Sequence, residues 1–179
     1  ATLPGAKEET LVTDDEEPFK VKFDKVPALK PAFEKTGTVT AANASSINDG
    51  AAALVVCSES KAKKLGLKPL VKILGQASAA QAPEWFTTAP ARAMDKVLKK
   101  TGLAIKDIDL FEVNEAFSVV ALATMRELNL DASRVNVHGG AVSLGHPIGA
   151  SGARILTTLI HAMKKQNAKR GMASICIGG

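Results

Sequence analysis

The chain has few of the aromatic residues on which nucleic-acid recognition depends. Its 179 residues include no Tyr, one Trp and six Phe, which leaves little surface on which bases could stack. The formal net charge is +5, and the basic residues are spread along the chain with only two local clusters, at 96–100 and 164–170. We therefore expect no nucleic-acid partner.

Cysteines and long apolar runs are also scarce. Two cysteines, Cys57 and Cys176, cannot form a disulfide framework, which favours a reducing compartment. No apolar run approaches membrane-spanning length, and no signal peptide opens the chain. We expect no membrane partner and a cytoplasmic location, or the mitochondrial matrix in a eukaryote. Because the sequence begins with Ala1, we expect a processed product or a piece of a longer protein.

Strand-like and helical patterns alternate from about residue 51 onward. Compact apolar runs predict strands at 51–56, 70–74, 108–113, 135–137 and 173–177. Apolar residues at helical spacing, with Ser58 as an N-cap and glycines as stop signals, predict helices at about 59–65, 90–101 and 116–128, and a long helix after the glycine-rich stretch that carries the apolar residues of 155–163. This alternation predicts an α/β fold in which helices cover a mixed sheet. Residues 1–36, with four prolines and no strong periodicity, predict an arm or a connecting region.

A glycine-rich stretch at 136–154 is the centre of the sequence. Glycines let the backbone turn sharply and approach closely, while Pro147 restricts His146 to an extended backbone. An apolar helical stripe follows, made of Ile155, Leu156, Leu159, Ile160 and Met163. The pattern predicts a held histidine beside a helix N-terminus, whose unpaired N–H groups favour a carbonyl oxygen or an anion. Taken alone, such a histidine is more often structural than catalytic.

The last residues carry a second candidate group. Cys176 lies at the end of the buried strand predicted at 173–177 and precedes Gly178 and Gly179. It could be an inert core thiol, or a reactive one whose pKa a histidine or backbone N–H groups depress. The two glycines could present N–H donors where an oxyanion forms.

Asn114 supplies a neutral amide at the end of the strand predicted at 108–113. It could orient a water or a carbonyl, or it could be a turn or cap residue. Together with His146 and Cys176 it predicts a site for acyl transfer or carbon–carbon bond formation. In that site the thiol acts as acid and base, and the other two groups stabilise an enolate.

Three motifs resemble the C-terminal signatures of the thiolases. They are NEAF at 114–117, GGAVSLGHPIGASGAR at 139–154 and CIGG at 176–179. The stretches at 38–45 and 48–53 resemble the thiolase segment that leads into the last strand of the N-terminal half. The sequences of these motifs are most similar to those of the acetoacetyl-CoA, or biosynthetic, type of thiolase.

The resemblance implies the thiolase fold, in which two similar βαβαβαββ halves form α-β-α-β-α layers beneath a loop domain. By position, residues 1–46 would be the tail of the CoA-covering loop domain. Residues 47–68 would be the last part of the N-terminal half, and residues 69–179 the C-terminal half without its final strand.

The resemblance also implies the reversible condensation of two acetyl-CoA to acetoacetyl-CoA and CoA through an acyl-cysteine. His146 would activate the nucleophilic thiol and, with a water held by Asn114, bind the thioester oxygen. Cys176 would move the α-proton, and the Gly178 N–H would stabilise the tetrahedral intermediate. The acyl-accepting cysteine lies outside these residues, and Cys57 cannot replace it. We therefore expect the isolated chain to fold poorly, to form no acyl-enzyme, and to work with the rest of a thiolase subunit in a dimer or tetramer.

No cofactor is required by this chemistry, since CoA thioesters are the substrates. The CoA contacts that the resemblance implies are Lys20, Lys25, Ala41, Ala44, Ser45, Phe86 and Phe117. It also implies, weakly, a potassium ion on the carbonyls of Ala41, Ala42, Ala44 and Val142.

Two other functions stay open. Ketoacyl synthases share the fold but usually place a histidine or asparagine where Cys176 stands, so the CIGG ending argues against them. The second is a thiolase-derived module that binds acyl-CoA or serves in assembly without catalysis. The missing nucleophile favours it, and the intact set of Asn114, His146 and Cys176 argues against it.

Overall fold

The computed structural model describes residues 11, 13–15 and 17–177. It divides into two units, Ala1–Lys30 and Pro31–Gly179. The described part of the first unit holds a short helix α1 (Glu17–Lys20) and a 3₁₀ helix η1 (Phe23–Ala28). Every residue of this unit whose burial is described is exposed. That agrees with the expected arm, which has too little apolar burial to offset its chain entropy.

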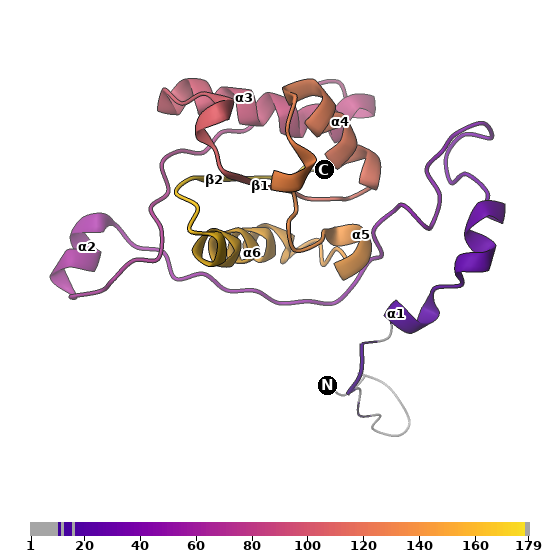
Figure 1. Cartoon of the computed structure of the whole chain (residues 1–179), viewed down its shortest axis with the longest axis horizontal. Coiled ribbons are helices and arrows are strands. Elements are labelled where there is room, and N and C mark those ends of the chain that lie inside the picture. The colour runs from indigo at the N-terminus through magenta and orange to yellow at the C-terminus, as the bar shows by residue number, and fades with distance from the viewer. Residues whose placement is uncertain (1–10, 12, 16, 178–179) are drawn as a thin grey trace. The chain divides into compact units, whose positions relative to one another are not determined.

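The second unit alternates helices with two short strands (Figure 1). Its elements in chain order are α2 (Glu59–Lys64), η2 (Pro83–Thr88), α3 (Ala89–Thr101), η3 (Ile105–Asp107), β1 (Leu110–Val113), α4 (Ser118–Leu128), η4 (Ala132–Arg134), α5 (Ala141–Leu144), α6 (Ser151–Gln166) and β2 (Gly171–Ser174). No helix between residues 17 and 177 is both long and apolar enough to cross a bilayer.

Strands β1 and β2 pair in parallel, with Leu110 opposite Gly171 and Val113 opposite Ser174. Helices α3 and α4 cover one face of this sheet, and α6 covers the other (Figure 1). Strand β1 is buried along its whole length, as expected for a parallel strand with helices on both faces. The expectation of a mixed sheet is wrong for the described residues, because both strands run in one direction.

Alternate side chains of β1 pack into two apolar cores, one on each face of the sheet. Phe111 and Val113 pack towards α3 and α4 in a cluster that also contains Met94, Leu98, Ile108, Ala121, Val135 and Met172. Leu110 faces α6, where it packs with Leu159 and Ala162. By the same alternation, Glu112 and the backbone position of Asn114 fall on the α6 side. The strand thus directs polar groups towards α6 at its C-terminal end.

Several helix signals act as the sequence predicts. The Ser58 hydroxyl accepts the Lys61 N–H at 3.2 Å at the start of α2, and Gly102 ends α3 at a φ of 69°. Lysines occupy the last turns of α3 and α6, where they complement the helix dipole. On α4, Val120 is buried, whereas its neighbour Val119 is 44% exposed.

Two predicted strands do not form in the described chain. Residues 51–56 and 70–74 belong to no helix or strand, and Val55 and Leu70 are 98% and 72% exposed. An apolar run becomes a strand only where another strand accepts its hydrogen bonds, and neither segment has such a neighbour here. The short strand expected at 135–137 is reduced to one bridge, between Val135 and Phe111.

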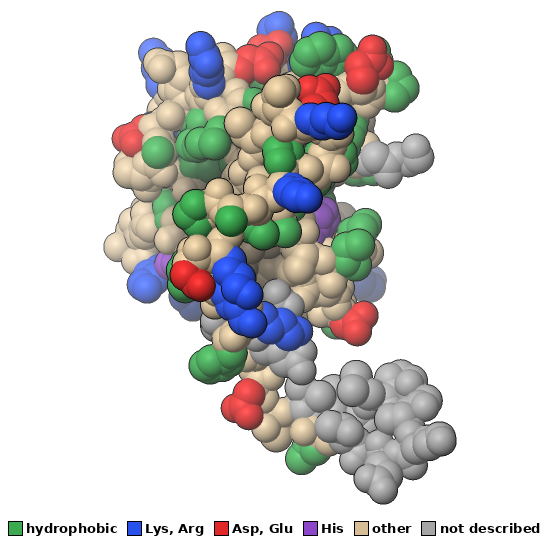
Figure 2. Space-filling model, turned by 90° about the vertical axis from the view of Figure 1, so that its right-hand side faces the viewer, with side chains coloured by type: hydrophobic (Ala, Val, Ile, Leu, Met, Phe, Trp, Pro, Cys, Tyr) green, Lys and Arg blue, Asp and Glu red, His purple; other side chains and the backbone are tan. Residues whose placement is uncertain are grey.

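Charged side chains are mixed on the surface. On the face drawn in Figure 2, lysines and arginines alternate with acidic and apolar side chains. That face therefore carries no single block of one charge.

Candidate active site

The parallel pairing brings Asn114 and Cys176 to the same end of the sheet. Asn114 directly follows β1 and is 1% exposed, and its N–H donates to the Ser174 carbonyl at 2.9 Å. Cys176 comes two residues after Ser174 and is 7% exposed. Ligand sites of layered α/β folds lie at the carboxyl ends of the strands, so both side chains occupy the expected edge.

His146 is held at both ring nitrogens and at its backbone. Its Nε2 lies 3.3 Å from Asn114 Nδ2, and its Nδ1 lies 2.6 Å from the hydroxyl of Ser151. Its N–H donates to the Ser46 carbonyl at 3.0 Å. Ser151 is the first residue of α6 and is fully buried. The expected pair of His146 and Asn114 therefore forms, and it lies against the N-terminus of α6.

Cys176 is the less closely tied member of the predicted set. Within the described residues, no hydrogen bond joins its sulfur to Asn114 or His146. Burial raises the pKa of the Cys176 thiol, so at neutral pH the thiol keeps its proton. Burial also lowers the pKa of His146, and the positive charge of Arg154 lowers it further, so the imidazole is neutral and can accept a proton.

The glycine-rich loop is shaped by close contacts that a side chain would prevent. Gly145 adopts a φ of 90°, and a Cβ there would overlap the side chain of Asn48. A Cβ on Gly140 would overlap the carboxylate of Glu115. That carboxylate accepts the Val142 N–H at 3.1 Å. These contacts fix the loop on either side of the short helix α5 and so determine where His146 points.

Three polar residues join the site although the sequence analysis did not assign them a role. Arg154 Nη2 donates to Asn114 Oδ1 at 3.4 Å, and its Nη1 lies 3.9 Å from Glu112 Oε2. Burial raises the pKa of Glu112 to about 7, against the lowering effect of Arg154, while Glu115 raises it further. Ser151 is the third. The sequence did contain a signal for Glu112, because it places a carboxylate in the middle of the buried strand predicted at 108–113. A buried carboxylate needs a polar or charged partner.

Several predicted CoA contacts come together around one bridge. Ala44 pairs with Phe117 in an isolated antiparallel bridge. The Ser45 N–H and hydroxyl both donate to the Ala116 carbonyl, at 3.1 and 2.8 Å. The Phe117 ring packs edge-on against Phe33, with 5.6 Å between centroids. This group places the predicted pantetheine-contacting segment directly beside the NEAF motif.

The other predicted contacts are not part of that group. Phe86 lies in η2 and is 36% exposed, and Ala41 lies in an exposed turn. Lys20 and Lys25 belong to the first unit. Gly178 lies outside the described residues. The roles of these residues stay predictions.

No cluster of three or more His, Cys, Asp or Glu side chains suited to a metal occurs in the described part of the chain. The predicted potassium ligands are instead backbone carbonyls, from the turn at 41–44 and from Val142 in α5. Neutral carbonyl oxygens suit a hard monovalent cation. Potassium binding at these carbonyls stays a prediction.

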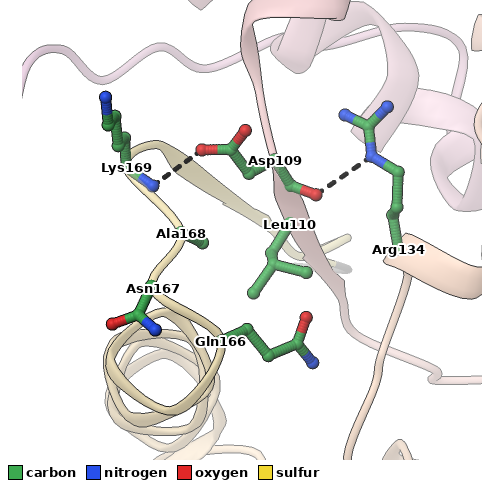
Figure 3. A pocket seen from close by; sticks show the side chains of 7 residues that line it. All are labelled: Asp109, Leu110, Arg134, Gln166, Asn167, Ala168 and Lys169. Atoms are coloured by element: carbon green, nitrogen blue, oxygen red, sulfur yellow. Dashed lines mark hydrogen bonds between the residues drawn. The ribbon is translucent and has the colours of Figure 1, made fainter.

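A surface hollow of about 320 Å³ lies at the opposite end of β1 (Figure 3). The Lys169 N–H donates to the carboxylate of Asp109 at 2.7 Å, and Arg134 Nε donates to the Asp109 carbonyl at 3.0 Å. The N–H groups of Arg170 and Lys169 lower the pKa of Asp109. The Asp109 carboxylate in this hollow is therefore committed to structure.

Comparison with known proteins agrees with this geometry. The family described as "Thiolase, C-terminal domain" matches residues 67–179, and "Thiolase, N-terminal domain" matches residues 1–60. The mitochondrial acetyl-CoA acetyltransferase of Rattus norvegicus is 56% identical over 97% of this chain and 41% of its own length. The cytosolic acetyl-CoA acetyltransferase of Gibberella zeae is 51% identical over 99% of this chain and 45% of its own length.

Solved structures give the same result. The crystal structure of the Bacillus anthracis acetyl-CoA acetyltransferase superposes with a TM-score of 0.89 at 46% identity, covering 99% of this chain and 45% of that one. The Acat5 thiolase of Ascaris suum, solved with coenzyme A, superposes with a TM-score of 0.82 at 48% identity, over 94% of this chain and 44% of that one. The chain thus spans less than half the length of the relatives it matches. With both halves of the family pattern represented and the fold shared, the chain belongs to the thiolase family.

Proposed function

We propose that the protein carrying this chain catalyses the reversible condensation of two acetyl-CoA to acetoacetyl-CoA and CoA. The observation that carries the proposal is the buried amide of Asn114 set 3.3 Å from a neutral His146, at the sheet end where Cys176 lies. The names of the relatives support acetyl-CoA as the acyl donor. The same proposal includes that the protein is a homo-oligomer and that it acts in lipid metabolism. Its proposed location is the cytoplasm or the mitochondrial matrix.

In the first half-reaction, a cysteine outside these residues attacks the thioester of acetyl-CoA. His146 Nε2 takes the proton of that thiol, and the acetyl group passes from CoA to the sulfur of the attacking cysteine. CoA then leaves as the free thiol. Once protonated, Nε2 changes from acceptor to donor and can bind the thioester oxygen. A water held by Asn114 supplies the second hydrogen bond.

In the second half-reaction, Cys176 removes an α-proton from another acetyl-CoA. Because burial raises its pKa, this thiol is protonated at rest. It therefore gives its proton to the departing CoA sulfur in the first half-reaction and enters the second as a thiolate. The enolate attacks the acetyl-cysteine, which forms the carbon–carbon bond and releases the cysteine thiolate. That thiolate takes its proton back from His146 Nε2, so both groups return to their starting state. Gly178 is assigned the donor for the tetrahedral intermediate by sequence position.

The substrate contacts of the proposal are CoA contacts. Ala44, Ser45 and Phe117, grouped by the bridge at the NEAF motif, would lie along the pantetheine arm. Lys20 and Lys25 would approach the nucleotide end. A potassium ion on backbone carbonyls is proposed as a structural addition, with no part in the chemical steps.

The test is made on the complete protein that carries residues 1–179. Acetyl-CoA is supplied, and acetoacetyl-CoA is measured by mass spectrometry together with the release of free CoA thiol. Cys176→Ala should reduce condensation by about a thousandfold or more while leaving CoA affinity nearly unchanged.

Unchanged condensation in Cys176→Ala would remove this thiol from the mechanism. The alternative, a non-catalytic module that binds acyl-CoA, predicts binding without any acetoacetyl-CoA in either protein. The two functions therefore differ in the unmodified protein, before any variant is compared.

A further inference from the structure

Arg154 contacts two buried polar groups that converge from the end of β1. It lies in the first turn of α6, and its side chain is 19% exposed. Its Nη2 donates to Asn114 Oδ1 at 3.4 Å, and its Nη1 lies 3.9 Å from Glu112 Oε2, on a side chain that is 2% exposed. The guanidinium thus lies between the Glu112 carboxyl group and the amide that faces His146, and its hydrogen bond among the described residues goes to the amide.

A guanidinium can only donate hydrogen bonds. The atom of Asn114 that faces Arg154 must therefore be the oxygen, and the NH₂ group is left facing His146 Nε2 at 3.3 Å. An NH₂ group is a donor, so Nε2 must be an acceptor without a proton. The neutral ring then carries its proton on Nδ1.

The other side of the ring agrees with this assignment. Nδ1 lies 2.6 Å from the hydroxyl of Ser151, which donates its own proton to the Pro147 carbonyl at 3.0 Å. The hydroxyl can therefore accept from Nδ1. All donors in the chain from Arg154 through Asn114, His146 and Ser151 to Pro147 point in one direction. If the amide turned over, its NH₂ group would face the guanidinium, donor against donor.

We propose that Arg154 is a positioning residue that fixes the amide orientation of Asn114, and through it the tautomer of His146 that leaves Nε2 free to accept a proton. The Glu112 side chain lies beside the guanidinium, with 3.9 Å between Oε2 and Nη1. The catalytic consequence rests on the proposed function, because only a thiolase reaction needs Nε2 as a base. The hydrogen-bond consequence does not, since it concerns the resting protein alone.

The direct test is ¹⁵N solid-state NMR of the complete protein labelled at histidine. His138, His146 and His161 are distinguished by comparison with His146→Asn. Protonated and unprotonated ring nitrogens give separate signals, so the tautomer is read without any substrate. We expect the Nδ1–H form in the unmodified protein.

Arg154→Met removes the donor and frees the amide to turn, so we expect a mixture of tautomers at His146. The kcat for condensation should fall about 10- to 100-fold, because the base is mis-protonated in part of the population, while KM should change by less than about twofold. Arg154→Lys keeps a donor without an acceptor and should restore most of the Nδ1–H form and of kcat. Arg126→Met, on the exposed face of α4, serves as the control and should change neither measurement.

Asn114→Asp calibrates the spectra, because a carboxylate facing Nε2 requires a proton there. We expect the His146 signals to change to the Nε2–H or doubly protonated form. This variant also tests the coupling if Arg154→Met proves unfolded by circular dichroism, and Arg154→Lys then tests the arginine.

An Nε2–H signal in the unmodified protein, or Nδ1–H retained unchanged in both Arg154→Met and Asn114→Asp, would overturn the inference. Loss of kcat in Arg154→Lys equal to that in Arg154→Met, with the tautomer unchanged, would also overturn it. If the unmodified protein makes no acetoacetyl-CoA, the proposed function fails. The NMR result still decides the orientation of the amide in that case.

Discussion

The buried carboxyl of Glu112 should make the stability of the protein depend on pH in a direction opposite to that of most carboxylates. Glu112 is 1% exposed, and its pKa is raised from 4.5 to about 7. The folded protein therefore holds this proton more tightly than the unfolded chain does. Its stabilising effect is fully present below pH 4.5 and is lost as the pH rises towards about 7.

The magnitude follows from the interval between the two pKa values. At about 1.4 kcal/mol per pH unit, the interval from 4.5 to about 7 corresponds to roughly 3 kcal/mol, of which about 2 to 3 kcal/mol falls between pH 5 and pH 8. Glu112→Gln has nearly the same shape and no titration. Between pH 5 and pH 8, the free energy of unfolding of Glu112→Gln should therefore fall by about 2 to 3 kcal/mol less than that of the wild type.

The measurement is urea unfolding of the complete protein, followed by circular dichroism at pH 5, 6.5 and 8. Glu127→Gln, an exposed substitution on α4, is the matched control and should keep the wild-type pH dependence. The reasoning is refuted if wild type and Glu112→Gln lose stability in parallel between pH 5 and pH 8. In that case the carboxyl ionises in the folded state as easily as in water.

Two further predictions concern the loop and the thiol. Gly145→Ala should lower the free energy of unfolding by about 2 kcal/mol or more, because the residue needs a φ of 90° and its Cβ would meet Asn48. Gly152→Ala, in the first turn of α6 with open space around it, should be neutral or stabilising by up to about 1 kcal/mol. Equal thermal shifts for the two variants would contradict this account. Cys176, whose pKa burial raises, should react with iodoacetamide at pH 8 at least about tenfold more slowly in the folded protein than in urea. Peptide mass spectrometry measures both rates, and equal rates would show that the thiol is not buried.

The sequence predicted those strands that find their partner within the second unit. The run at 108–113 contains β1, and the run at 173–177 overlaps β2, which begins two residues earlier. The equally apolar runs at 51–56 and 70–74 remain unpaired. Periodicity and composition report that a segment can be buried. They do not report which strand will accept its hydrogen bonds, because pairing joins residues far apart in the chain.

The site could be predicted in part for a similar reason. The residue types and motifs pointed to Asn114 and His146 as site residues, and the structure places the two side chains together. Arg154 stood inside the same motif, yet spacing alone could not show that its guanidinium reaches back across 40 residues to Asn114. The direction of a long side chain depends on packing around it. A sequence pattern does not contain that information.

Asn136 shows how the end of the sheet and the site depend on one another. Its Oδ1 accepts the Val113 N–H at 2.8 Å, and its Nδ2 donates to the Val113 carbonyl at 2.9 Å. One amide thus replaces a neighbouring strand at the last residue of β1. The Asn136 N–H also donates to the Phe111 carbonyl at 2.9 Å, and at Asn136 the backbone turns, with a φ of 48°, into the glycine-rich stretch that contains His146. A true strand at this position would continue straight past the site. The hydrogen bonds that close the sheet edge are therefore also the ones that direct the histidine towards Asn114.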